Sequence, residues 1–248
     1  MSKRFVGRVA LVTGAGRGMG EATARRLAAE GAAVSVVDRD AAVAEGVAKS
    51  IIAAGGRAIA IVADVGKAGD VEAMVARTVK EFGALHHAVN NAGIAGRPGL
   101  LAETSIEDWG DVINVNLNGV FYGLKWQIPA MIAAGGGSIV NVSSIYGHHG
   151  LPTYGAYTAA KHAVIGLTRA AGLEYVKQGV RVNAFCPGMY DTTMGNSGGA
   201  VSDAIAKMIP LGRLGRPEEA AAVNCFLLSD DASFVNAADY AGDAGMLH

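Results

Sequence analysis

The chain alternates short apolar runs rich in β-branched residues with longer alanine-rich stretches of helical periodicity. The short runs predict seven strands, the last of them weak, at residues 9–13, 34–38, 58–62, 88–90, 138–142, 181–185 and 239–241. The longer stretches predict helices at residues 18–30, 41–53, 70–82, 106–133, 154–178 and 217–228. Strands and helices that alternate in this way are typical of βαβ units. We therefore predict an α/β fold with one doubly wound, Rossmann-like parallel sheet and helices on both faces.

This series of elements runs without a linker, so we predict a single domain over residues 1–248. Hydrophobic residues make up 51% of the chain and charged residues 17%, a composition that can bury a full-sized core. Residues 188–199 are rich in glycine and polar side chains, and they follow a predicted strand end, where open α/β sheets bind ligands. We therefore predict a substrate lid near residues 188–210.

Charge and composition exclude several classes of function. The 21 basic residues nearly balance the 22 acidic ones and form no basic block, so we expect neither nucleic acid nor a membrane surface as a partner. No apolar run reaches the roughly 18 residues of a membrane span, and the first residues do not form a signal peptide, so we expect a cytoplasmic protein. Cys186 and Cys225 lie among apolar residues without another thiol or histidine at ligand spacing, which predicts reduced cysteines and no metal site.

A glycine-rich turn, Thr-Gly-Ala-Gly-Arg-Gly-Met-Gly at residues 13–20, joins the first predicted strand to the first predicted helix. Because Gly14, Gly18 and Gly20 lack a Cβ, the backbone there can approach a diphosphate and the helix can pack closely on the strand. The spacing departs from G-x-G-x-x-G and fits T-G-x-x-x-G-x-G. The alternative is a glycine-rich turn that only tightens packing.

Asp38 ends the second predicted strand, where a carboxylate can accept hydrogen bonds from the adenosine ribose hydroxyls and repel a 2′-phosphate. This position predicts NAD rather than NADP as the cofactor. The alternative role for Asp38 is the cap of the helix that starts near Ala41, and both roles could hold together. Arg17 and Arg39 could each reach a 2′-phosphate, but we expect Arg17 near the diphosphate and Arg39 over the adenine or in solvent.

Polar residues also end the third and fourth predicted strands, which share the carboxyl edge of the sheet. Asp64 and Val65 follow the third strand, and Asn90-Asn91-Ala92-Gly93 closes the fourth. We expect these residues to line the adenosine half of a cofactor cleft.

Tyr157 and Lys161 form an i, i+4 pair on one side of a predicted helix, and Ser144 ends the fifth predicted strand before them. Lowering a phenol pKa from about 10 to near 7 takes about 4 kcal/mol in favour of the phenolate. One positive charge a few ångströms away contributes on the order of 4 kcal/mol at an effective dielectric of 20. Lys161, aided by an oxidised nicotinamide, is therefore sufficient for this shift. The Tyr157–Lys161 pair is a weak signal on its own. The prediction becomes specific because the pair follows the glycine turn and Ser144 along the chain.

Over essentially its whole length the chain resembles the short-chain dehydrogenase/reductase family. The motifs that carry the resemblance follow in family order: Thr13-Gly14…Gly18-Met19-Gly20, Asp64, Asn90-Asn91-Ala92-Gly93, Asn116, Ser143-Ser144, Tyr157…Lys161 and Pro187-Gly188…Thr192. The resemblance implies that Tyr157 is the general acid/base and that Ser144, or failing it Ser143, orients the substrate oxygen. It further implies that Lys161 lowers the tyrosine pKa and holds the nicotinamide ribose, and that Asn116 holds a water of the proton relay.

The expected cofactor contacts come from the whole set of motifs. They are Gly14, Arg17, Gly18, Met19, Gly20, Asp38, Arg39, Asp64, Val65, Asn91, Ala92, Gly93, Tyr157, Lys161, Pro187, Gly188 and Thr192. The expected substrate pocket holds Ser144, Tyr146, Tyr154 and Met189, and the tyrosines could equally be packing residues.

Two features are left open by the sequence. His148 and His149 lie between Ser144 and Tyr157, where a loop histidine can touch substrate but is more often merely solvated. The tail has Asn236-Ala237 where the family commonly has Thr-Gly, and Asp243-Ala244-Gly245 where it has Asp-Gly-Gly. These two departures leave open the geometry of the last strand and any subunit contact that this strand makes.

Together these observations predict hydride transfer between a nicotinamide cofactor and a secondary alcohol or ketone. The apolar and aromatic loops favour an uncharged substrate and admit a cyclic one. The alternatives are a 3-oxoacyl-type or sugar/polyol reductase of the same family, a catalytically silent dinucleotide-binding regulatory module, and a nucleotide-sugar epimerase or dehydratase. The family also implies a homotetramer, and the long predicted helices at 106–133 and 154–178 could pack across a dyad.

Overall fold

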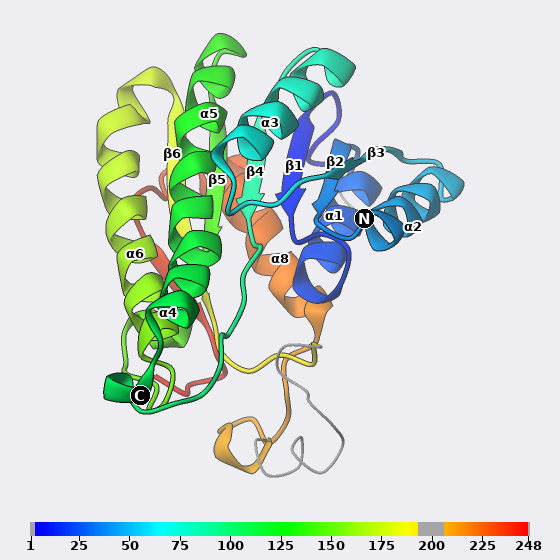
Figure 1. Cartoon of the computed structure of the whole chain (residues 1–248). Coiled ribbons are helices and arrows are strands. Elements are labelled where there is room, and N and C mark those ends of the chain that lie inside the picture. The colour runs from blue at the N-terminus through cyan, green and yellow to red at the C-terminus, as the bar shows by residue number, and fades with distance from the viewer. Residues whose placement is uncertain (1–2, 193–205, 248) are drawn as a thin grey trace.

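A computed structural model describes residues 3–192 and 206–247, and within them seven parallel strands form one sheet in the order β3-β2-β1-β4-β5-β6-β7 (Figure 1). The strands are β1 Val9–Thr13, β2 Ala33–Asp38, β3 Arg57–Val62, β4 His87–Asn90, β5 Gly137–Val142, β6 Val180–Pro187 and β7 Asp239–Gly242. The predicted fold class is confirmed. Because β1 pairs with β2 on one side and with β4 on the other, the direction of winding reverses there. Such a reversal opens a crevice at the carboxyl ends of the strands.

Helices cover both faces of the sheet. They are α1 Gly18–Ala29, α2 Ala41–Ala53, α3 Ala68–Phe82, α4 Ile106–Ile113, α5 Gly119–Ala133, α6 Gly155–Tyr175 and α8 Pro217–Leu228. Successive residues of β1 point to opposite faces, so Ala10 and Val12 pack with α1, α2 and α8, whereas Leu11 packs with α3, α5 and α6. Both faces of the strand are buried, which explains its unbroken apolar run.

The predicted single helix over residues 106–133 is wrong at its centre. The helix α4 ends at Ile113, a π-helical turn (η2) spans Asn114–Asn118, and α5 follows from Gly119. The extra residue in this turn directs the buried side chain of Asn116 to the backbone of Ile94, where it makes two hydrogen bonds. Such π-bulges are frequent at functional sites.

The last strand forms in spite of the unusual tail. β7 pairs in parallel with β6, and Asp239 stands opposite Ala184. The side chain of Asn236 accepts a hydrogen bond from the Val182 N–H and donates one to the Gly172 carbonyl, so it joins β6 to α6. Ala237 has a φ of 56°, a conformation that glycine adopts at lower cost.

Among the described residues, no helix combines the length and apolarity needed to cross a membrane.

Candidate active site

A cleft of about 290 Å³ opens at the carboxyl ends of β1 to β4. It is lined by Gly14, Arg17, Gly18, Met19, Val37, Asp38, Arg39, Ala63, Asp64, Val65, Asn91, Ala92, Gly93, Ile94, Val115 and Thr192. Twelve of the expected cofactor residues are therefore brought together in one cleft. Val37, Ala63, Ile94 and Val115 line it as well but were not predicted. Each of them directly flanks a residue that the motifs identify, Val115 being next to Asn116, so extending each motif by one position would have found them.

The glycine turn is shaped to keep its backbone open to the cleft. Gly14 and Gly18 have φ values of +60° and +57°, and a Cβ on Gly14 would lie 2.9 Å from the Ala92 Cα. The Asn91 amide donates to the Thr13 and Gly14 carbonyls at 2.9 and 3.1 Å, which fixes the turn against the end of β4. Gly20 lies outside the cleft, where a Cβ would collide with the Gly14 carbonyl oxygen, so its role is close packing of α1.

Gly16 belongs to the site although the motif analysis gave it no role. Its N–H donates to the Asp38 carboxylate at 3.0 Å, and a Cβ there would collide with Val43 and Asp38. The only signal in the sequence was its membership of the glycine run. The contact ties the turn to the end of β2 and holds Asp38 at the cleft.

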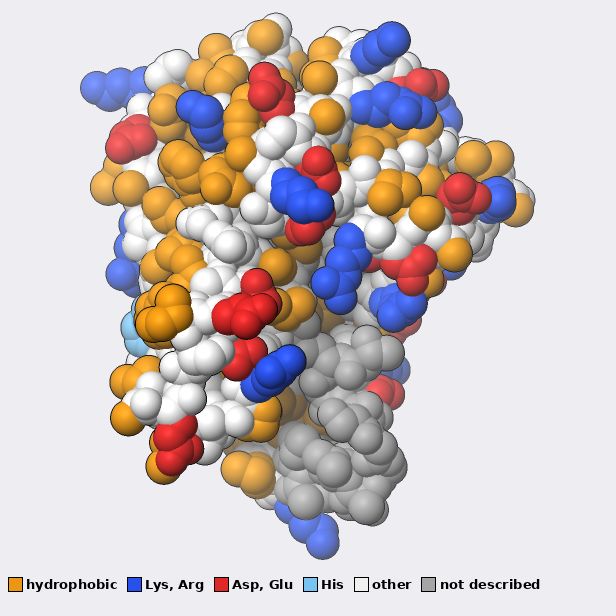
Figure 2. Space-filling model, viewed as in Figure 1, with side chains coloured by type: hydrophobic (Ala, Val, Ile, Leu, Met, Phe, Trp, Pro, Cys, Tyr) orange, Lys and Arg blue, Asp and Glu red, His pale blue; other side chains and the backbone are white. Residues whose placement is uncertain are grey.

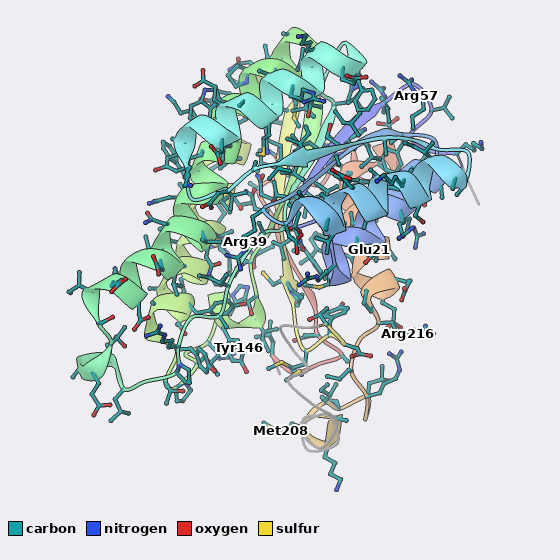
Figure 3. All side chains as sticks on the ribbon, turned by 45° about the vertical axis from the view of Figure 1, so that its right-hand side comes forward. Glu21, Arg39, Arg57, Tyr146, Met208 and Arg216 are labelled. Atoms are coloured by element: carbon teal, nitrogen blue, oxygen red, sulfur yellow. The ribbon has the colours of Figure 1, made fainter. Side chains whose placement is uncertain are left out.

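Asp38 does not cap α2. The Asp40 side chain accepts from the Ala42 N–H and caps the helix, because Asp40 directly precedes the first helical residue. Asp40 also pairs with Arg17 at 3.1 Å. Arg39 lines the same cleft, and it lies above Tyr146 in Figure 3. Of the two arginines near Asp38, Arg17 is thus engaged by a neighbouring carboxylate.

Ser144 and Tyr157 meet beside this cleft. Ser144 follows β5 and caps the short 3₁₀ turn Ile145–Gly147 (η3) by accepting from the Tyr146 N–H at 3.2 Å. Tyr157 lies in the first turn of α6, and a hydrogen bond with Ser144 lowers its pKa. Burial has the larger effect and raises the pKa of Tyr157 above its ordinary value. The two side chains of the expected catalytic pair therefore lie close enough to interact.

Lys161 is 4% exposed and donates from Nζ to the Val142 carbonyl at 2.8 Å. Burial lowers its pKa to about 8, and Nζ lies 5.5 Å from the centre of the Tyr157 ring. The expected lowering of the tyrosine pKa by Lys161, aided by an oxidised nicotinamide, stays a prediction.

Asn116 holds the protein backbone through both ends of its amide. Its Oδ1 accepts from the Ile94 N–H at 2.8 Å, and its Nδ2 donates to the Ile94 carbonyl at 2.7 Å. A Cβ on Gly93 would lie 3.0 Å from this Oδ1 and 3.7 Å from the Lys161 Nζ. Asn116, Gly93 and Lys161 are therefore neighbours, and the amide keeps the cleft wall in place beside the lysine.

The expected pocket residues Tyr146, Tyr154 and Met189 lie on three separate segments of the chain. Burial raises the pKa of Tyr146, which follows Ser144 in η3. Tyr154 directly precedes α6, and the Thr153 carbonyl beside it accepts from the Gly99 N–H. Met189 is held by a backbone hydrogen bond from Gly215.

The remaining expected residues follow β6 or lie in the loop after η3. Gly188, after Pro187, donates its N–H to the Gly242 carbonyl, and Pro187 and Gly188 lie outside the cleft lining. His148 contacts Asp239, whereas His149 is exposed. Residues 193–205 of the expected lid lie outside the described residues.

The chain is similar to known proteins over almost its whole length. The profile of the family described as enoyl-(acyl carrier protein) reductase matches residues 14–247. The cyclohexanol dehydrogenase of Acinetobacter sp. (strain SE19) is 48% identical over 243 residues, which are 98% of this chain and 96% of that protein. The chain belongs to the short-chain dehydrogenase/reductase family.

Other members of the short-chain dehydrogenase/reductase family are nearly as similar. The cis-4-hydroxycyclohexanecarboxylate dehydrogenase of Sinomonas cyclohexanicum is 45% identical over 251 residues, which cover 99% of this chain and 98% of that protein. The crystal structure of levodione reductase has a TM-score of 0.95 at 38% identity and covers 98% of this chain and 99% of that one.

The residues of the cleft fit the nicotinamide cofactor of this family. Gly14 and Gly18 combine positive φ values with positions where a Cβ would crowd the opposite wall, and Asp38 offers carboxylate oxygens at the end of β2. Among the residues that the structure describes, no group of three histidine, cysteine, aspartate or glutamate side chains could hold a metal ion.

Proposed function

We propose that the protein is an NAD-dependent dehydrogenase/reductase that interconverts a secondary ring alcohol and its ketone. The grouping of Ser144 and Tyr157 beside buried Lys161, next to the glycine-lined cleft, is the observation that carries this proposal. It unites a hydrogen-bond donor, an acid/base and a cation next to the cleft that the glycine turn lines.

In this proposal the chain moves the proton and positions the reacting oxygen. Tyr157 takes the hydroxyl proton during oxidation and returns it during reduction. Ser144, which contacts Tyr157, donates to the substrate oxygen and stabilises the developing alkoxide. Lys161 holds the cofactor ribose, and Asn116 fixes the wall against which the cofactor rests. The nicotinamide, when bound, accepts or donates the hydride.

NAD is proposed over NADP because of the charge at the end of β2. Asp38 lines the cleft, and its two oxygens accept from the N–H groups of Gly16 and Asp40, which orients the carboxylate firmly. A phosphate on the ribose 2′-oxygen would approach this fixed negative charge. Arg17 is paired with Asp40, so only Arg39 remains to compensate, and an exposed arginine contributes about 0.2 to 1 kcal/mol.

An uncharged ring alcohol is the proposed substrate class. Tyr146, Tyr154 and Met189, the expected pocket residues, carry aromatic or apolar side chains and no formal charge near neutral pH. The similarity to a cyclohexanol dehydrogenase over almost the whole chain supports a six-membered ring.

We also propose a homotetramer built from one domain per chain. Exposed hydrophobic side chains lie along the outer helices, including Ile106, Trp109, Phe121, Leu173 and Val176. Hydrophobic side chains gather over α5 and α6 on the left of Figure 2. A surface of this kind is typical of a subunit interface.

A panel of alcohols tests the proposed function. Cyclohexanol, a linear secondary alcohol, a polyol and a 3-hydroxyacyl thioester are each offered with NAD and with NADP, and cofactor reduction is followed by absorbance. We expect the highest kcat/KM for cyclohexanol with NAD. Preference for the thioester or the polyol would replace the proposed substrate class with one of the alternatives, and turnover of none of them in either direction would contradict the proposed function.

A further inference from the structure

The carboxylate of Asp239, at the start of β7, joins two elements of the candidate site. Its Oδ2 lies 3.1 Å from the His148 Nε2, and its Oδ1 lies 2.7 Å from the Arg169 Nη2. The Asp239 side chain is 19% exposed, compared with 31% for His148 and 56% for Arg169. One largely buried carboxylate therefore engages two cationic or polar partners from different parts of the chain.

The His148 contact reaches the turn that begins at Ser144. In η3 the Gly147 N–H donates to the Ser144 carbonyl at 2.9 Å, and the His148 N–H donates to the Ile145 carbonyl at 3.0 Å. The turn fits tightly on α6, because a Cβ on Gly147 would lie 2.8 Å from the Ile165 Cδ1 and 3.0 Å from the Lys161 carbonyl oxygen. A short, hydrogen-bonded turn on a close-packed surface moves as a unit. A displacement of His148 therefore also displaces Ser144.

The Arg169 contact reaches the helix that carries Tyr157 and Lys161. Arg169 lies twelve residues, or about three turns, beyond Tyr157 on the continuous helix α6. Asp239 pairs in register with Ala184, whose side chain packs with Ile165 of the same helix. The aspartate therefore faces α6, and its second oxygen is anchored to a rigid element.

The charge of Asp239 also acts behind the catalytic serine. Burial raises the pKa of the Cys186 thiol to about 11, and the negative charge of Asp239 adds to this effect. The same thiol has hydrogen bonds with the Ser143 side chain and the Ser144 backbone. Asp239 is thus close to the end of β5 by a second route, through β6.

We propose that Asp239 is a positioning residue, which clamps the Ser144 turn through His148 to the Tyr157 helix through Arg169. The clamp holds the serine hydroxyl at its working distance from the tyrosine. It assigns His148 to the protein scaffold rather than to the substrate. This inference rests on the proposed function, because the positioned groups are those that would hold the substrate oxygen.

Hydrogen exchange in the protein without substrate tests the clamp itself. The amides of Gly147, His148 and His149 are bonded within the turn and report on its opening. We expect Asp239→Ala and His148→Ala to accelerate their exchange by about tenfold or more, and we expect His148→Gln to restore the wild-type rate, because a glutamine amide can donate to the same carboxylate. Lys49→Ala, which removes an exposed ion pair on α2, serves as the control and leaves these amides unchanged.

Kinetics with cyclohexanol, normal and deuterated at the carbinol carbon, test the catalytic consequence. A displaced serine slows the chemical step, so Asp239→Ala lowers kcat by between about three- and thirtyfold and increases the deuterium isotope effect, while the Kd for NAD is unchanged. His148→Gln keeps most of the activity. A merely structural role would lower the amount of folded enzyme and the melting temperature, and would leave the isotope effect of the active fraction as in the wild type.

The outcomes separate this inference from the proposed function. Unchanged amide exchange in Asp239→Ala, or an unchanged isotope effect in an enzyme that turns over cyclohexanol, overturns the clamp. Loss of activity in His148→Gln with a raised substrate KM and normal exchange would show that His148 touches substrate, and would also overturn it. If the wild-type protein turns over no alcohol or ketone, the proposed function fails, and the exchange result alone decides whether Asp239 holds the turn.

Discussion

Tyr157 is surrounded by groups that oppose one another in setting its protonation state. Burial raises its pKa, the hydrogen bond with Ser144 lowers it, and Tyr146 adds a smaller increase. Lys161, at 5.5 Å from the ring centre, is itself pushed towards neutrality by burial. Deprotonation of Tyr157 in the proposed reaction therefore depends on the substrate hydroxyl and the bound cofactor as well as on the lysine.

Replacing Tyr157 with phenylalanine tests its role as the acid/base. The ring and its packing are retained and only the hydroxyl is lost, so we expect kcat to fall at least about a hundredfold and the Kd for NAD to stay within a factor of about two. Steady-state kinetics and a cofactor titration measure the two quantities. Activity above about a tenth of the wild-type rate would contradict the assignment.

Asp38 controls the choice of cofactor in the proposed function. One unit of charge repulsion at about 4 Å costs on the order of 4 kcal/mol at an effective dielectric of 20, before screening. We expect kcat/KM for NAD to exceed that for NADP by more than about tenfold. We expect Asp38→Ala to reduce this ratio. Asp40→Asn keeps the cap on α2 but weakens the hold on Arg17, so it separates the effect of the arginine from that of Asp38. A preference of the wild-type protein for NADP would show that Arg17 and Arg39 attract the 2′-phosphate more strongly than Asp38 repels it.

His87 links stability to pH. It is buried on β4, with Nδ1 2.8 Å from the Ser138 hydroxyl oxygen, and burial lowers its pKa from 6.5 to about 3. As the pH falls, His87 takes up a proton in the unfolded chain before it does so in the folded chain. Its contribution to the free energy of unfolding is therefore fully present above pH 6.5 and is lost as the pH falls from 6.5 to about 3. The expected loss from His87 is about 2 kcal/mol at pH 5.

Urea unfolding at pH 7 and pH 5 measures this loss. His87→Asn should reduce the difference between the two pH values, whereas His162→Asn, at an exposed site on α6, should not. An equal difference in the wild type and in His87→Asn would assign the acid sensitivity to other groups.

At the scale of elements, buried polar contacts join the sheet to the helices that carry the site. The Asn90 amide donates to Gln127 of α5 at 3.0 Å and to Asn141 of β5 at 2.9 Å, and Asn141 donates to Thr168 of α6 at 3.0 Å. All of these groups are buried and paired, which makes the network specific for one arrangement of strands and helices.

Gly123 makes room for this network. A Cβ there would lie 2.6 Å from the Asn90 Oδ1, so Gly123→Ala should lower the free energy of unfolding by about 1 to 3 kcal/mol. Gly46, on the exposed side of α2, has nothing within 4 Å, and Gly46→Ala should raise it by about 0.4 to 1 kcal/mol. Denaturant unfolding should therefore show that replacing glycine with alanine lowers the free energy of unfolding in α5 and raises it in α2. A stabilised Gly123→Ala would mean that Asn90 can move without cost.

The sequence predicted the strands closely but could not locate the break between α4 and α5. Residues 106–133 keep a helical periodicity throughout, and a π-helical turn costs only one additional residue. The reason for the break is the contact between Asn116 and Ile94, which are far from adjacent in the chain. Local pattern carries no information about such a contact.

At the scale of the whole molecule, the exposed hydrophobic side chains on α4, α5 and α6 predict assembly. Light scattering at micromolar concentration should give about four times the 25.2 kDa of one chain. Phe121→Glu, at a side chain that is 48% exposed on α5, should shift the mass to a smaller species. Ile52→Glu, at a side chain that is 54% exposed on α2, is the control and should keep the larger mass. A monomer in the wild type would refute the tetramer.

The sequence by itself determined the parallel sheet and the main wall of the cleft. The periodicity of apolar residues and the spacing of glycines are local properties, and they determine strands, helices and turns without contacts from distant residues. It also predicted Ser144, Tyr157 and Lys161 as one site, because Ser144 follows β5 and the other two lie on the helix between β5 and β6. Only the tertiary structure decided that Gly16 binds Asp38, that Asp40 caps α2, and that His148 contacts Asp239. These are contacts between side chains or backbone groups brought together by folding, and their energies depend on distance and burial that no pattern of residue types contains.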